Sequence, residues 1–173
     1  MKFEKEAAIS ALLYISERVR HATYHRIAKV MYFADLLHLE KYGRTIFGAE
    51  YRAYEFGPVP HQVYGMLKAA EKKSEGQSLE GAFRVSRSAS SPFVQALASA
   101  NLDYLSASDI ECLDHAIQVW GEKSFPKTTL ASHDAAWEQA WRTKPNSVMP
   151  LESIVLTLKN GSQVLQHINN PHP

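Results

Sequence analysis

The chain has 173 residues, of which 45% are hydrophobic and 21% are charged, and its formal net charge is +1. This length and composition are typical of one globular domain with its own hydrophobic core, and they exclude an intrinsically disordered chain. The near-neutral charge provides no general basic surface, so nucleic-acid binding is not expected.

The sequence also indicates where the protein works. Its single cysteine, Cys112, excludes an intrachain disulfide framework and favours a reducing compartment. The first residues lack the continuous apolar run of a signal peptide, and no stretch reaches the roughly 20 apolar residues of a membrane span. We therefore expect a cytoplasmic protein with no membrane partner.

Two amphipathic helices are predicted in the first 43 residues. Apolar residues at helical spacing form the buried stripe of each helix: Ala8, Leu12, Ile15 and Val19 in the first, and Ile27, Met31, Ala34 and His38 in the second. Thr23 is the predicted N-cap of the second helix, and Gly43 marks its end. The short connection favours an antiparallel pair in which the two stripes bury each other.

An extended segment and a stiff corner are predicted next. The aromatic runs 46–48 and 51–56 are separated by glycine and favour a short extended or hairpin segment. Gly57-Pro58-Val59-Pro60 then predicts a rigid corner, because proline fixes its own φ and restricts the residue before it. Pro60 is assigned to the first turn of a third helix, and Gly57→Val is expected to harm folding if Gly57 adopts φ > 0.

The second half of the chain predicts further helices and one short strand. Serine-rich or charged runs at 71–81 and 86–91 predict loops around Phe83-Arg84-Val85, and residues 93–97 are assigned to a strand. Ser108 to Glu111 resembles a capping box that opens a helix with Ile110, Leu113, Ile117 and Trp120 inward. Another helix is expected over 129–141, then a last pair broken at Asn160-Gly161 and a frayed tail over 169–173. The predicted fold is mainly α (α+β), a compact helical domain with a small hairpin or sheet.

Several histidines raise the question of catalysis or metal binding. Asp35 and His38 share a helix face and could form an acid–base pair, but the simpler interpretation is a half-buried polar pair whose members satisfy each other. His21 and His25 are interpreted as surface residues, and His133 as a packing partner of Trp137. Catalytic zinc requires three protein ligands, and no such set is predicted.

Signatures of the common enzyme classes are absent from the sequence. Cys112 lies three residues before His115, yet a lone cysteine among inward-facing apolar residues is more often a small core residue than a nucleophile. The chain has no glycine-rich phosphate loop, nucleophile elbow or zinc-protease motif. We therefore predict no enzyme, cofactor or metal site, and keep a hydrolase or metal enzyme that uses Asp35, His38 and His133 as the alternative.

Aromatic residues are unusually dense between positions 32 and 64. They are Tyr32, Phe33, Tyr42, Phe47, Tyr51, Tyr54, Phe56 and Tyr64. Most are expected in the core, and the remainder, placed around a proline-stiffened turn, are candidate anchors for a protein partner.

Several motifs in a fixed order resemble the SocA-like antitoxin family, also called the Panacea domain. They are the helix string Met31 to Leu39, Tyr42-Gly43-Arg44, Phe47-Gly48, Tyr51-Arg52-Ala53, Gly57-Pro58-Val59-Pro60 and Val63-Tyr64, followed by Leu130-Ala131-Ser132-His133 and Trp137. The likeness extends from about residue 9 to 141. Residues 1–145 are accordingly assigned to the SocA-like domain, and 146–173 to a C-terminal helical extension packed on it.

The resemblance implies a bacterial or phage-associated antitoxin that neutralises a co-encoded protein toxin by direct contact. Its alternative is an adaptor that delivers the toxin to an AAA+ protease for degradation, and a homodimer is left open. The partner-binding residues expected on this basis are Tyr32, Asp35, His38, Tyr42, Arg44, Tyr51, Tyr54, Pro58, Val59 and Pro60.

Overall fold

The computed structural model describes residues 2–72, 81–87 and 91–170. The loops expected at 71–81 and 86–91 fall largely in 73–80 and 88–90, and the frayed tail ends in 171–173, so most of these predictions lie outside the described residues. The helices are α1 (Lys5–Arg18), α2 (Tyr24–Tyr42), α3 (His61–Lys72), η1 (Leu102–Tyr104), α4 (Ala107–Trp120), α5 (Phe125–Ser132), α6 (Ala135–Thr143), α7 (Leu151–Val155) and α8 (Gly161–Asn169). The strands are β1 (Tyr51–Tyr54), β2 (Gly57–Pro60), β3 (Phe83–Arg87) and β4 (Pro92–Ala96). The mainly α class is confirmed.

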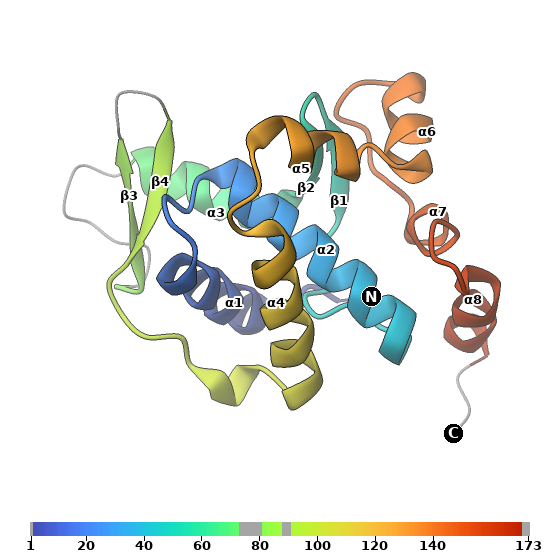
Figure 1. The fold of residues 1–173 in the computed structure, drawn as a ribbon, viewed down its shortest axis with the longest axis horizontal. Helices are drawn as coiled ribbons and strands as arrows, with labels where there is room; N and C mark the ends of the chain where they lie inside the picture. Colours follow the sequence, from blue (N-terminus) through green and yellow to red (C-terminus); the bar gives the residue numbers. More distant parts are fainter. Residues whose placement is uncertain (1, 73–80, 88–90, 171–173) are drawn as a thin grey trace.

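Helix α2 is the central element. Figure 1 shows it crossing the middle of the molecule, with α1, α3 and the β3–β4 hairpin toward one end and α6 to α8 toward the other. Thr23 caps its start by accepting from Arg26 N–H, and Gly43 ends it with φ 69°, as predicted. Although α1 contacts α2, the most extensive partner of α2 is α4, so the expected pairing of the first two helices describes only a minor contact.

The predicted corner at Gly57 to Pro60 is wrong, because this segment is a strand. β2 pairs antiparallel with β1 from Tyr51↔Pro60 to Tyr54↔Gly57, and the tight turn lies at residues 55–56. The carbonyl of Pro58 accepts from Lys29 on α2 at 3.0 Å, so this residue's backbone faces away from β1 and its missing N–H costs no ladder bond. Pro60 ends the strand, and α3 begins one residue later than assigned.

Two helix boundaries also differ from the predictions. Ser106, not Ser108, caps α4, and Asp109 completes the capping box. The expected helix over 129–141 is two helices, α5 and α6, which are broken at His133 because the Asp134 side chain caps α6 by accepting from Trp137 N–H at 2.9 Å. The buried face of α4 also differs from the prediction. Helix α4 buries Cys112, Leu113 and Ala116, whereas Ile110, Ile117 and Trp120, which were expected to point inward, are only partly buried.

The C-terminal segment packs against the rest of the chain. Residues 146–149 run along the free edge of β1, where Met149 N–H donates to Tyr51 O at 2.8 Å. Met149, Ile154, Val155 and Val164 then share a core cluster with Tyr32, Leu39 and Tyr51. The expected break at Asn160-Gly161 separates α7 from α8, while the domain boundary at residue 145 stays a prediction. Within the described ranges, no helix has the length and apolar character needed to span a membrane.

Candidate partner-binding surface

The tip of the β1–β2 hairpin is held in place by hydrogen bonds from two helices. Lys29 of α2 donates to the Pro58 carbonyl beneath it, and the Trp137 indole N–H of α6 donates to Tyr54 O at 2.9 Å. Gly57 has φ 104°, a conformation suited to glycine, so the condition under which Gly57→Val is expected to harm folding is met. Because the tip is anchored to separate helices, the side chains it carries are presented in a fixed position.

Three rings form what we call the aromatic patch: His25, Phe56 and Phe125. Phe56 at the hairpin tip is 49% exposed, and Phe125 at the start of α5 is 47% exposed. Their ring centroids lie 5.1 Å apart in an edge-to-face arrangement, and His25 of α2 lies 4.2 Å from Phe125. Large apolar rings that remain exposed yet are already packed on one another are typical of anchor residues in protein interfaces.

His25 adds an uncharged ring to the patch. Burial, followed by the nearby cations Lys29 and Arg26, lowers its pKa to about 4. Its Nε2 lies 3.0 Å from the Thr129 hydroxyl, which fixes the ring against α5. At neutral pH the imidazole is therefore uncharged, and the centre of the patch is free of formal charge.

A second set of rings lies beside the hairpin, on its α3 side. Tyr64 of α3 packs against Tyr54 at 5.5 Å and against Tyr24 at 6.2 Å. The Tyr24 hydroxyl donates to Leu67 O and to Glu71, at 3.1 and 3.2 Å. All three tyrosines are partly exposed, so they extend the apolar surface with polar tips that can bond to a partner.

Lys29 is a buried cation directly below the hairpin tip. Its side chain is 1% exposed, and its hydrogen-bond acceptor is the Pro58 carbonyl. Burial lowers the pKa of its ammonium to about 7, from an ordinary 10.5. Since the charged form is disfavoured in the folded protein, Lys29 releases a proton on folding between these two pH values.

We expect Lys29→Met to flatten the pH dependence of stability above neutrality. In the wild type, the unfolded chain binds more protons between pH 7 and 10.5, so the Lys29 contribution to stability is complete above 10.5 and is lost as pH falls toward 7. The slope from one such group reaches about 1.4 kcal/mol per pH unit. Urea unfolding of both proteins between pH 7 and 9.5 measures this slope. If the free energy of unfolding changes with pH in the same way in both proteins, the lowered pKa of Lys29 is contradicted.

Asp35 is the centre of a buried polar cluster. It accepts from Ile46 N–H at 2.6 Å and from the Tyr51 hydroxyl at 2.8 Å, and it is 2% exposed. Burial raises its pKa to about 7, despite the opposing effect of these hydrogen bonds. Asp35 thus ties the loop after α2 and the strand β1 to the helix, which is a structural task.

His38 belongs to a separate polar cluster at the N-terminus of α4. Its Nδ1 lies 2.9 Å from Arg44 O, and its Nε2 lies 3.1 Å from the Ser108 hydroxyl and 3.0 Å from the Asp109 carboxylate. Arg44 donates to the same carboxylate at 2.8 Å. The expectation that Asp35 and His38 satisfy each other is therefore wrong, since each is fully buried and bonded to other groups.

The ten partner-binding residues predicted from the sequence do not form one surface. Tyr32, Asp35, His38, Tyr51, Pro58 and Pro60 are buried, Tyr54 and Val59 are partly exposed, and Tyr42 and Arg44 are exposed. Tyr54 and Val59 lie on the hairpin, which is bonded to α2 at Lys29, whereas Tyr42 and Arg44 lie at the C-terminal end of this helix, roughly 20 Å from Lys29 along its axis. Which of them contacts a partner stays a prediction.

Sequence reasoning missed the rings that complete the patch. Phe125 lies outside the aromatic-rich stretch, and the signal for it was Ser124 and Pro126, an N-cap and an early helical proline that mark the start of α5. His133 and Cys112 were correctly interpreted: His133 stacks on Trp137 at 3.5 Å, and Cys112 is buried in the core. Over the described ranges, no group of three or more His, Cys, Asp or Glu side chains could hold a metal ion.

The chain forms a small, mainly α domain with a cluster of partly exposed aromatic rings on its surface. Residues 27–138 match the family described as Antitoxin SocA-like, Panacea domain. The chain belongs to this family, which confirms the resemblance found in its motifs. No curated protein and no solved structure matches the chain.

Proposed function

We propose that this protein is an antitoxin that neutralises a protein toxin by direct contact through the aromatic patch. Family membership supports the antitoxin role, and the single observation that supports the location is the pair of exposed, mutually packed rings of Phe56 and Phe125. Tyr54 and Val59 lie on the same hairpin as Phe56 and form the rim of the proposed contact. The buried positions of Asp35 and His38, bonded to backbone and neighbouring side chains, support a structural rather than a catalytic task for both.

The test uses the protein encoded by the neighbouring gene as the toxin. We expect Phe56→Ala and Phe125→Ala each to weaken its binding about 30-fold, because central aromatic anchors contribute about 2 kcal/mol or more to an interface. Isothermal titration of the purified proteins measures the affinity, and growth after co-expression measures neutralisation. Both side chains are about half exposed, so their truncation should leave the melting temperature nearly unchanged.

Two controls separate the patch from other exposed aromatic positions. Tyr104→Ala removes a ring that is 52% exposed on η1, and Tyr42→Ala removes one at the far end of α2. Both variants should bind as the wild type does. Loss of binding in Tyr42→Ala together with full binding in Phe56→Ala would move the contact to the Tyr42 and Arg44 end of the helix.

Neutralisation by binding and delivery to a protease predict different fates for the toxin. If binding alone suffices, the toxin half-life in cells is unchanged or longer when this protein is present. If the chain acts as an adaptor for an AAA+ protease, the half-life falls. A pulse-chase measurement with and without this protein distinguishes the two.

A further inference from the structure

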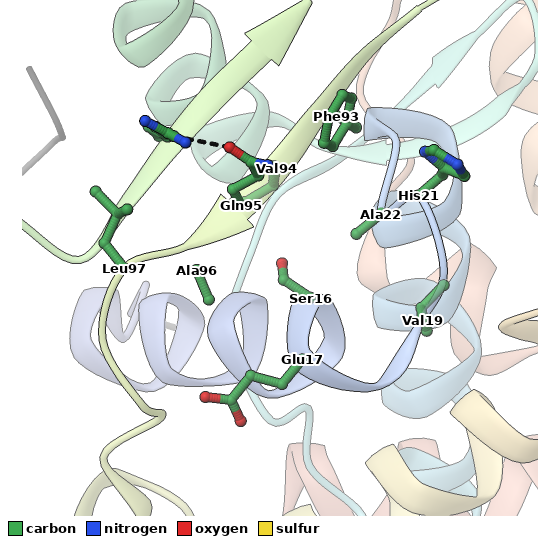
Figure 2. Close-up of a pocket in the computed structure, with 11 residues that line it drawn as sticks. Ser16, Glu17, Val19, His21, Ala22, Phe93, Val94, Gln95, Ala96 and Leu97 are labelled. Carbon is green, nitrogen blue, oxygen red and sulfur yellow. Dashed lines mark hydrogen bonds between the residues drawn. The ribbon is translucent and has the colours of Figure 1, made fainter. Parts of the chain in front are cut away.

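The outer edge of β4 lies beside an open cavity. Strand β4 pairs with β3 on one side, and Figure 2 shows residues of β4, of the C-terminal part of α1 and of the segment that follows α1 arranged around the cavity. The cavity has a volume of about 580 Å³ and is lined by, among others, Ser16, Val19, Ala22, Phe93, Ala96 and Leu97. It shares no residue with the aromatic patch.

The backbone of β4 directs unused hydrogen-bonding groups toward this cavity. Val94 N–H donates to Ala22 O at 3.0 Å, so the backbone groups of Val94 face away from β3. Alternate residues of a strand point their N–H and C=O to the same edge, so those of Ala96 also face outward. Leu97 N–H donates to Ala82 O on the β3 side, which agrees with this alternation. In the described part of the chain, no other element donates to or accepts from the outward groups of Ala96.

The chain itself begins to cover this edge and then leaves it. Thr23 forms an isolated antiparallel bridge with Phe93, but at His21 the backbone turns away with φ 45°, a left-handed conformation uncommon outside glycine. The His21 ring packs edge-on against Phe93 at 5.6 Å, which supports the turn. A chain that continued straight beyond Ala22 would run beside residues 95–97, and the cavity occupies that place.

We propose that the outer edge of β4 is a second binding site, which takes an extended segment of a partner protein as a third strand on the β3–β4 hairpin. The outward N–H and C=O of Ala96 on a strand edge are matched by extended polypeptide, whose backbone offers both an acceptor and a donor. Side chains of an added strand alternate between its two faces, so those that point toward α1 meet Val19 and Ala22 and should be small and apolar. The open stretch is short and recessed over α1, which suits a free segment better than the β4 of a second copy.

A library of random decapeptides displayed on phage provides the probe, and it does not depend on the proposed toxin. We expect selection on the wild-type chain to yield peptides whose affinity falls at least tenfold in Ala96→Pro. Proline removes the outward N–H and places its ring on the edge, while the β3-facing bonds of the neighbouring residues remain. Ala96→Ser keeps the N–H at nearly the same size and is the matched control, with an affinity expected within twofold of the wild type.

Amide exchange measured by NMR tests the same edge without a substitution. In the free chain, the Ala96 amide should exchange faster than the Val94 amide, and a selected peptide should protect Ala96. The proposal is overturned if no peptide is selected, if peptides bind Ala96→Pro as tightly as the wild type, or if Ala96 stays unprotected in the complex. A concentration-dependent dimer that Ala96→Pro abolishes would also overturn it and assign the edge to a second copy. If Ala96→Pro fails to fold, the exchange result decides.

Discussion

Gly57→Ala is expected to lower the free energy of unfolding by about 3 kcal/mol or more. Gly57 has φ 104°, where any L side chain is strained. A Cβ at this position would also lie 2.4 Å from the Ser132 hydroxyl oxygen and 2.8 Å from the Lys29 ammonium nitrogen. Both neighbours are buried, so the hairpin tip has to shift away from α2 and α5. Urea denaturation of the variant and the wild type measures the difference.

Gly65 offers a matched control within the same chain. It lies inside α3, and a Cβ there would meet no atom within 4 Å. Gly65→Ala should therefore stabilise the protein by about 0.5–1 kcal/mol, since alanine is the better helix former. A Gly57→Ala variant as stable as the wild type would show that the turn conformation or its packing on Ser132 is incorrect.

Asp35→Ala is expected to destabilise the protein by about 4 kcal/mol. The substitution leaves the Tyr51 hydroxyl and the Ile46 N–H buried without their acceptor, and each such orphan costs about 1–3 kcal/mol beyond the cavity. Asp35→Asn should be far milder, because the amide oxygen still accepts from Ile46 and its NH₂ can donate to Tyr51. Thermal and urea unfolding of the two variants measures the contrast, and equal losses would contradict the observed hydrogen bonding.

The same pair of proteins gives a signed pH dependence. The pKa of Asp35 is raised from 3.8 to about 7, so the folded chain holds a proton that the unfolded chain has released. Its contribution to stability is complete below 3.8 and is lost as pH rises toward 7. The stability of Asp35→Asn relative to the wild type should therefore increase between pH 4 and 7. Taking the difference between the two proteins cancels the opposite trend of His25, and a constant difference would contradict the raised pKa.

Local signals allowed most of α1, α2 and β4 to be predicted, because their determinants lie close together in the chain. Thr23 starts α2 through its capping side chain, Gly43 ends it through its left-handed backbone, and the apolar stripe between them fixes the buried face of the helix. The break between α5 and α6 was missed because it depends on the side chain of Asp134. This carboxylate accepts hydrogen bonds from Trp137 N–H and from the Tyr32 hydroxyl, and so starts a new helix instead of continuing the first one.

The sequence by itself determined the family and the mainly α class, since these depend on ordered motifs and on the spacing of residues that are close together in the chain. Only the tertiary structure decided that Gly57 to Pro60 is a strand, because strand pairing depends on the partner β1 and on Lys29, which is 29 residues from Pro58. The location of the aromatic patch was also decided by the tertiary structure alone. Phe56 and Phe125 are 5.1 Å apart in space but far apart in sequence, and burial, which removed Tyr32 and Tyr51 from the surface, is a property of the packed whole.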